Sequence, residues 1–329
     1  MKKSIPFLVL GFAAALWSGY WFMGRSAIVQ GFAEAQDNLA KDGITLTASD
    51  LKVRGYPLNF KTDLTDTVLS GAEMHIEPKL VQISAKAYRP NIWTLSSDKP
   101  TRIKLQGANG ENWDFFLTGE QMRVEMHSTA SGKLQALDAD MKSLKAIAAP
   151  NGGLPPITAV EIGTAQLMPN EAPIQEGMRT AFNIRGVKLA DGAAGNLQRA
   201  FGDFISRIEG TGVATQLASL DTDDIDLWKQ GGGLTIPDFE LDWGDVSFIG
   251  EVNIDMSAGR ANGVATLGVK DADALITAFV NAGLLNQTQA LGATFLLMAA
   301  PKDAQGRTVL EFPIVDNAIT LLGQTLHQF

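Results

Sequence analysis

The stretch LKVRGYPLNFK, residues 51–61, reads as a β-strand whose two halves place their apolar side chains differently. In the first half Leu51 and Val53 stand at odd positions. In the second half the apolar residues stand at even positions: Tyr56, Leu58 and Phe60. Because successive side chains alternate between the faces of a strand, this change of parity should turn the apolar face outward. What happens around Gly55 therefore decides what kind of sheet the chain forms.

A β-bulge inserts one extra residue, corrects such a change of parity and bends the strand. Gly55 supplies the backbone freedom that a bulge needs, and Pro57 fits within a sheet only at an edge or a bulge. We therefore predict one strand, bent at a bulge formed by Gly55 and Pro57, with its apolar side chains on the inner face of a curved sheet. The alternative is two short strands joined by a turn.

The two-residue period recurs over residues 44–149 and again over residues 234–329, with turn residues between the runs. A helical run lies in the second region and follows Asp271, which suits the N-cap position. The predicted fold class is α+β and mostly β: a single N-terminal transmembrane helix, then curved antiparallel sheet with a few packed helices. The predicted parts are a transmembrane anchor (1–25), a juxtamembrane helix (26–43), an N-terminal β-meander (44–149), a mixed linker and helical region (150–233) and a C-terminal β-rich region with helices (234–329).

The amino terminus carries an apolar run, Ile5 to Met23, of 19 residues without a charge. A helix of that length measures about 28 Å, close to the thickness of a bilayer core. Lys2 and Lys3 precede the run, which favours the short end in the cytoplasm and the rest outside. Aromatic residues that suit a membrane interface gather at its far end: Trp17, Tyr20, Trp21 and Phe22. A cleaved signal peptide is the rival interpretation, but apolar residues continue past the small residues at 13–15 that could imitate a cleavage site.

Bulk composition excludes some classes of function. Hydrophobic residues make up 45% and charged residues 19% of the chain, which is typical of a globular protein. The net charge is −9, and since nucleic-acid affinity depends on neutralising phosphates, we predict no nucleic-acid partner. There is no cysteine, which rules out disulfides, thiolate metal sites and cysteine nucleophiles.

No residue pattern predicts a catalytic or metal site. The three histidines, His75, His127 and His327, do not have the spacing of a zinc site. The acidic group at 221–226 alternates carboxylates as a calcium loop does, but Ile225 and Asp226 break the EF-hand pattern. A solvated acidic loop explains it better. We predict no catalytic residue, no metal and no cofactor, and hence a protein that is not an enzyme.

Several segments together resemble a known family. These are the uncharged N-terminal run, GITLTASDLKVRGYPLNF, KAYRP, FELDWGDVSFIGEVNIDMSAGRANGVATL and NAITLLG. The chain is similar in them to the uncharacterised alphaproteobacterial envelope family known as domain of unknown function 2125. The resemblance implies a protein of the bacterial inner membrane with most of its chain in the periplasm. More distantly, the style is similar to that of AsmA-like envelope proteins, whose long curved sheets guide lipids on an apolar inner face.

The candidate site is an apolar sheet face. Its residues are Tyr56, Leu58, Phe60, Val81 and Ile83. Core packing is the default interpretation of any one of them, whereas an open or half-covered face would form a groove for an acyl chain. The leading hypothesis is a membrane-anchored protein that binds or shields a lipid in envelope maintenance. The alternative is a structural or interaction protein that recruits partners, not identifiable from the sequence, through a sheet edge.

Overall fold

The structure, a computed structural model, describes residues 5–107, 110–129, 133–170, 177–220, 222–321 and 324–328. This part of the chain is mostly β, with twenty strands in antiparallel sheet and five helices. It divides into two compact units. Unit 1 comprises Met1–His127 and Ile147–Gly153, and unit 2 comprises Ser128–Ala146 and Leu154–Phe329. The predicted mostly β fold with antiparallel strands is confirmed.

Unit 1 is a meander of bent strands. The strands pair in two ladders, β2–β3–β6–β7–β10 and β1–β4–β5–β8–β9. Strands that follow each other closely in the chain, such as β3 and β4, belong to different ladders, so each pair acts as one long bent strand with one half in each ladder. The strands are β1 (Thr45–Thr47), β2 (Asp50–Arg54), β3 (Asn59–Thr65), β4 (Val68–Ser70), β5 (Met74–Pro78), β6 (Leu80–Lys86), β7 (Arg89–Ser96), β8 (Thr101–Gln106), β9 (Asn112–Thr118) and β10 (Gln121–Ser128). The bends of these strands lie between the paired halves.

The change of parity in the opening stretch falls at a hairpin turn. β2 and β3 pair antiparallel on either side of it, so the chain reverses direction there. Gly55 has a φ of 101°, the Tyr56–Pro57 peptide bond is cis, and the amide of Asn59 donates to the carbonyl oxygen of Gly55 over 2.9 Å. The predicted bulge at Gly55 and Pro57 is wrong, because glycine freedom and proline suit a tight turn equally well. The alternative, two strands joined by a turn, is correct.

Helix α1 (Ile5–Lys41) is one continuous helix, where the sequence predicted an anchor followed by a separate juxtamembrane helix. Among the described residues, no helix combines the length and the apolar character that crossing a membrane requires.

Aromatic side chains dock α1 onto the unit 1 sheet. Three of them donate hydrogen bonds to carbonyl oxygens: Trp17 to Pro57 (2.8 Å), Tyr20 to Ala87 (2.8 Å) and Trp21 to Asn59 (2.9 Å). The Trp21 ring also stacks on Phe60, with centroids 5.7 Å apart and planes 19° apart. The far end of the uncharged run, predicted to lie at a membrane interface, therefore covers the sheet of unit 1.

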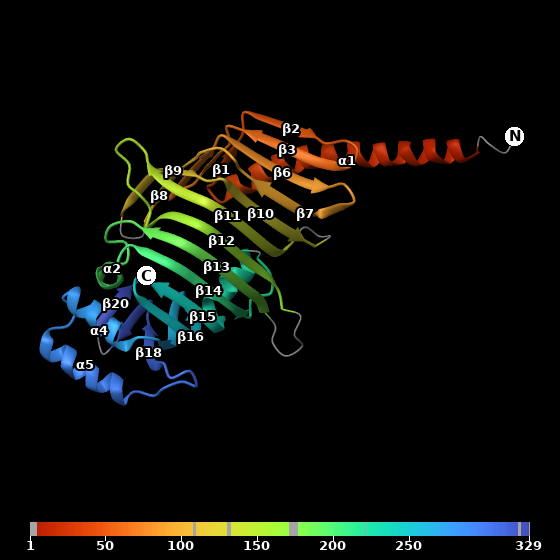
Figure 1. Ribbon diagram of the computed structural model, residues 1–329. Coiled ribbons are helices and arrows are strands. Elements are labelled where there is room, and N and C mark those ends of the chain that lie inside the picture. Colours follow the sequence, from red (N-terminus) through yellow and green to blue (C-terminus); the bar gives the residue numbers. More distant parts are fainter. Residues whose placement is uncertain are drawn as a thin grey trace. The chain divides into compact units, whose positions relative to one another are not determined.

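Unit 2 is a ladder in which each strand pairs with its sequence neighbour, as Figure 1 shows for β11 to β16. The ladder continues in the same way through β20. The strands are β11 (Leu134–Ala148), β12 (Ile157–Pro169), β13 (Gly177–Leu189), β14 (Phe204–Thr215), β15 (Gly233–Trp243), β16 (Val246–Ser257), β17 (Arg260–Val269), β18 (Thr308–Val315), β19 (Ala318–Leu321) and β20 (Gln324–Gln328). Residues 150–233, expected as a linker and helical region, thus hold three of the long strands.

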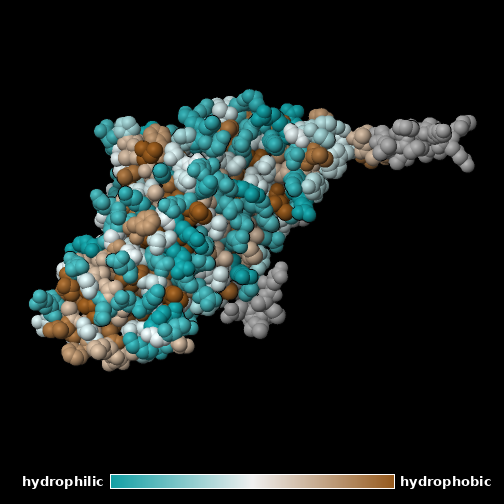
Figure 2. Space-filling view, viewed as in Figure 1, coloured by the Kyte–Doolittle hydropathy of each residue, from teal (hydrophilic) through white to brown (hydrophobic). Residues whose placement is uncertain are grey.

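Four helices belong to unit 2: α2 (Gly195–Phe201), α3 (Thr222–Gly231), α4 (Ala272–Asn281) and α5 (Gln287–Ala299). The predicted N-cap is confirmed, because the Asp271 side chain accepts a hydrogen bond from the amide of Ala274. The core of the unit lies between one face of the sheet and helices α2 and α4. Helix α5 leaves large apolar side chains exposed, and Figure 2 shows apolar residues gathered in this part of unit 2.

We expect Gly55→Ala to destabilise unit 1. A Cβ at Gly55 would lie 2.7 Å from the carbonyl oxygen of Asn59, and a φ of 101° is strained for any L side chain. Strain of this kind costs about 1–3 kcal/mol, which thermal unfolding measures as a lowered melting temperature. The matched control is Gly19→Ala in α1, where a Cβ meets nothing within 4 Å. It should leave the melting temperature unchanged or raise it, and equal effects of the two variants would contradict the hairpin geometry.

Candidate functional site: an apolar cavity in unit 2

A bulge in β15 decides which side chains face the core of unit 2. The register with β16 shifts between Ile236 and Phe239, where β15 has one residue more than its partner. Pro237 lies in this interval, in agreement with the confinement of proline to bulges and edges. The extra residue changes the parity of the strand, so the side chains on both sides of it line the same cavity: Ile236, Phe239, Leu241 and Trp243.

Helix α2 brings two further apolar side chains, Leu197 and Phe201, to this face. The helix ends at Gly202, whose φ of 87° suits glycine. The indole of Trp243 donates a hydrogen bond over 2.9 Å to the carbonyl oxygen of Gly202, and the Phe201 ring lies 5.4 Å from the Trp243 ring. This bond satisfies the only polar atom of the tryptophan side chain, so its ring can face an apolar space.

Phe201 is the centre of an aromatic cluster. Its ring lies 5.8 Å from Phe248 of β16, in an edge-to-face arrangement, and 5.7 Å from Phe279 of α4. Phe248 in turn meets Phe312 of β18 edge to face at 6.2 Å. Such contacts add about 0.5–1.5 kcal/mol per pair to the area that the rings bury. The cluster fixes α2 and α4 above the sheet.

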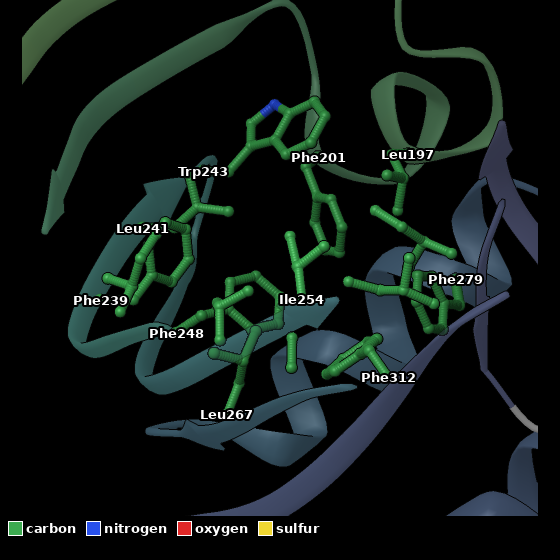
Figure 3. A pocket seen from close by; sticks show the side chains of 15 residues that line it. Leu197, Phe201, Phe239, Leu241, Trp243, Phe248, Ile254, Leu267, Phe279 and Phe312 are labelled. Atoms are coloured by element: carbon green, nitrogen blue, oxygen red, sulfur yellow. The ribbon is translucent and has the colours of Figure 1, made fainter. Parts of the chain in front are cut away.

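These elements line a half-open cavity of about 290 Å³ in unit 2. Figure 3 shows the rings of Phe201, Phe248, Phe279 and Phe312 arranged around it. Every lining side chain is apolar: Leu197, Phe201, Ile236, Phe239, Leu241, Trp243, Phe248, Val252, Ile254, Ala265, Leu267, Phe279, Phe312, Ile314 and Ile319.

This cavity can bind a ligand only by burying the ligand's apolar surface against its own apolar lining. An apolar cavity of about 150 Å³ stays dry and accepts a small hydrocarbon, because water finds no hydrogen-bond partners in it. The cavity of unit 2 is larger, and the described residues that line it include no titratable group for acid–base work. Its lining can bind a hydrocarbon chain and exclude water from it.

Comparison of the sequence with known protein families identifies the family of this chain. The family described as "uncharacterized protein conserved in bacteria", DUF2125, matches residues 21–317. The chain belongs to this family. Neither the comparison with curated proteins nor that with solved structures finds a match. The match covers α2, α4 and strands β15 to β18, which provide nearly all of the cavity wall in this DUF2125 protein.

The opposite face of the same strands carries a charged cluster. Arg207 of β14 pairs with Asp242 (2.8 Å) and Glu240 (2.5 Å) of β15, and the Ser247 hydroxyl donates to Asp242 over 2.5 Å. Burial alone would raise the pKa of Asp242, but the hydrogen bonds from Ser247 and Arg207 outweigh it and lower the pKa below its ordinary value. The cluster ties three strands together directly behind the cavity wall.

The five sequence-predicted groove residues do not come together as one groove. Tyr56 and Leu58 lie in the hairpin turn, with more than half of each side chain exposed. Val81 is half-buried opposite Leu64. Phe60 is buried against Trp21, and Phe60 and Ile83 both line a cleft between α1 and the sheet of unit 1. The sheet face that the sequence singled out is therefore partly covered by a helix.

The polar candidates form local pairs. His75 hydrogen-bonds to Glu77 (2.6 Å), which lowers the pKa of Glu77, and His127 lies 3.1 Å from Glu125. In the acidic group, Asp221 lies outside the described residues, and the remaining carboxylates belong to helix α3 rather than to a loop. Within the described residues, no three histidine or acidic side chains are grouped so that they could hold a metal ion.

Sequence reasoning did not identify the residues of the unit 2 cavity as a site, although the sequence contains a signal for them. Between Ile236 and Phe239 the apolar positions change from even to odd around a proline. This is the same signal that drew attention to Gly55. In β15 it does mark a bulge, and the bulge lies at the cavity.

The lowered pKa of Asp242 makes stability depend on pH in a stated direction. A depressed folded-state pKa contributes stability that is complete above the unfolded-state pKa, near 3.9, and is lost as the pH falls through the folded-state value. We expect Asp242→Asn to lower the melting temperature at pH 7, and the gap to wild type to narrow between about pH 5 and pH 3. Asp245→Asn, at an exposed turn position, is the control and should run parallel to wild type. A constant gap for Asp242→Asn would show that its charge plays no part.

Proposed function

We propose that this protein binds the acyl chain of a lipid in the cavity of unit 2 and is not an enzyme. The observation that carries the proposal is that fifteen side chains from the sheet, α2 and α4 line one cavity and that all of them are apolar. Each CH₂ group buried there would contribute about 0.8 kcal/mol, so ten would contribute about 8 kcal/mol before entropic losses. The lining offers nothing to hold a polar ligand, which favours hydrocarbon over any other chemistry.

The proposal includes a place for the protein: the bacterial inner membrane, with most of the chain in the periplasm. The run Ile5 to Met23 is uncharged, and Phe12 and Leu16 of α1 expose 67% and 60% of their surface. Exposed Tyr88 lies beside Lys86, whose ammonium group is 5.7 Å from its ring. Aromatic and basic side chains of this kind suit the headgroup layer. The start of α1 would then hold unit 1 at the bilayer.

Filling the cavity should abolish lipid binding. Ala265 of β17 lines it between Val252 and Phe312, so Ala265→Phe places a ring in the space. We expect organic extraction and mass spectrometry of the purified full chain to find one bound lipid class in wild type and to find it depleted at least tenfold in the variant. Thr266→Phe, the neighbouring residue on the other face of β17, is the matched control and should retain the lipid. An equal lipid content in all three proteins would refute the site.

Tryptophan fluorescence provides a second test of lipid binding in the unit 2 cavity. A brominated fatty acid quenches only the indoles that it touches, and Trp243 is the tryptophan in the cavity wall. Trp243→Phe should remove a quenching component that Trp228→Phe, outside the cavity, keeps.

The attachment to membranes is tested separately. We expect Phe12→Arg combined with Leu16→Arg to move the full chain from the membrane to the soluble fraction, because a charge at each position opposes burial in hydrocarbon. Val29→Arg combined with Ala33→Arg, at exposed positions farther along α1, should leave the distribution unchanged. Retention of the Phe12 and Leu16 variant in membranes would argue against anchoring by this helix.

A further inference from the structure

A basic pocket lies on the outer face of the unit 1 sheet, the face that α1 does not cover. In β3, Phe60 faces α1, so the next residue, Lys61, points to the opposite side. The pocket there has a volume of about 280 Å³ and spans β3, β6, β7 and β10. A chain with a net charge of −9 gathers four basic residues in its lining: Lys61, Lys86, Arg89 and Arg123.

Three of these four cations have no acidic partner. Arg123 pairs with Glu125 over 2.7 Å, and His127 lies 3.1 Å from the other oxygen of the same carboxylate. The other three cations form no ion pair within the part of the chain that the structure describes. Among the described residues that line the pocket, Glu125 is the one acidic side chain. Because Arg123 neutralises it, the pocket keeps an excess of positive charge.

The strand register places like charges next to each other. Lys86 of β6 and Arg89 of β7 are directly paired across the turn that joins the two strands. Asn59 is paired with Lys86, and Lys61 with Ser84, so Lys61 and Lys86 are diagonal neighbours. Like charges directly opposite each other destabilise a sheet, and long side chains also reach each other across the diagonal. An anion bound among these side chains would relieve the repulsion.

The remaining polar residues of the pocket suit an oxyanion. Asn59, Ser84 and Thr94 belong to its lining. Their amide and hydroxyl groups can donate hydrogen bonds to an anion, as ammonium and guanidinium groups do. A phosphate group offers several acceptor oxygens, and its geometry matches the fork of a guanidinium group. The chemistry of the pocket is therefore that of a phosphate site.

The pocket lies at the end of the sheet where α1 leaves it. Tyr20 of α1 donates a hydrogen bond over 2.8 Å to the carbonyl oxygen of Ala87, in the turn between Lys86 and Arg89. The preceding part of α1 extends beyond the sheet (Figure 1) and carries the exposed apolar side chains proposed above to enter the bilayer. Leu16 precedes Tyr20 by about 6 Å along the helix axis. Since the headgroup layer is about 5–8 Å thick on each side of the hydrocarbon, its phosphates would lie at the level of the pocket.

We propose that this pocket binds the phosphate group of an anionic phospholipid in the bilayer to which α1 attaches the chain. The charged groups of Lys61, Lys86 and Arg89 bind the phosphate oxygens, and the acyl chains stay in the membrane. The inference rests on the membrane attachment proposed for α1, which supplies the phosphate, and not on the cavity of unit 2. It adds a lipid class to that attachment, because the pocket selects for negatively charged headgroups.

Flotation of the full chain with lipid vesicles tests the site. One set of vesicles contains phosphatidylcholine alone, and the other also contains phosphatidylglycerol, which is anionic. A basic side chain near an anionic surface contributes about fivefold to affinity, so three should make wild type prefer the anionic set about a hundredfold. Lys86→Gln combined with Arg89→Gln should lower the affinity for the anionic set about 25-fold and leave binding to the neutral set unchanged.

A matched control removes the same charge elsewhere on these strands. Lys79 stands before β6 and Lys99 after β7, at the ends opposite to Lys86 and Arg89. Lys79→Gln combined with Lys99→Gln should keep the preference for anionic vesicles. The melting temperature of the unliganded Lys86 and Arg89 variant should equal or exceed that of wild type, because the substitutions remove a like-charge pair. Its weaker binding would then not result from unfolding.

A gain of affinity provides a test that unfolding cannot imitate. Glu125→Gln removes the carboxylate that pairs with Arg123, so the pocket gains one free cation. We expect this variant to bind the anionic vesicles about fivefold more tightly than wild type. Asp98→Asn removes one negative charge from the turn after β7 and should leave the affinity unchanged.

The outcomes separate this site from the attachment by α1. Binding to neutral vesicles without a preference for the anionic set would overturn the pocket alone, as would equal losses in the two double variants. Failure of wild type to bind either set would contradict the attachment and, with it, the lipid source of the phosphate. Inorganic phosphate that displaces the chain from anionic vesicles at micromolar concentration would identify a site for free phosphate and overturn the lipid assignment.

Discussion

Both units depend on the alternation of side chains along a β-strand, because each sheet has one face that must be kept apolar. Where the apolar side chains change from odd to even positions or the reverse, the strand must end in a turn, as at Gly55, or contain an extra residue in a bulge, as at Pro237. In β15 the second solution keeps Ile236 and Phe239 on one face. Without it, the side chains beyond the proline would point into the charged cluster of Arg207 and Asp242 rather than toward α2.

Tryptophan is used in the same way in the two units. Trp21 in unit 1 and Trp243 in unit 2 each bury a ring and donate the indole N–H to a backbone carbonyl oxygen. The ring adds apolar area while the hydrogen bond fixes its orientation, so a helix is held at one height above a sheet. A helix held at a fixed height by large rings, with glycine or alanine elsewhere on its surface, leaves space beneath it. That is the origin of the cleft under α1.

Much of the fold could be predicted from the sequence, and the failures have physical causes. Two-residue periodicity located the strands of residues 44–149, and Asp271 marked the start of α4. Gly55 and Pro57 misled, because positive φ and a fixed proline ring are compatible with a turn as well as with a bulge. Ile5 to Met23 was ambiguous for another reason: a bilayer and a sheet face are both apolar, and residues 17–21 satisfy either.

The candidate site could be predicted only in part. Phe60 and Ile83 do face a cleft, but the exposure of Tyr56 depends on the turn geometry, which the alternation alone does not fix. The cavity of unit 2 combines residues from α2 and α4 with residues from five strands. Periodicity identifies an apolar face on each element, yet the volume left between such faces depends on how closely the aromatic cluster lets them approach.

The pairing of unit 2 has a consequence for how the chain reaches this structure. From β12 to β20 each strand hydrogen-bonds to the strand that precedes it, so its partner has already been synthesised when it emerges. The strands can therefore pair one after another during synthesis, and β18 and β19, which form part of the cavity wall, are synthesised last. An emerging chain would thus expose the inner face of β15 to β17 until its final strands close over it.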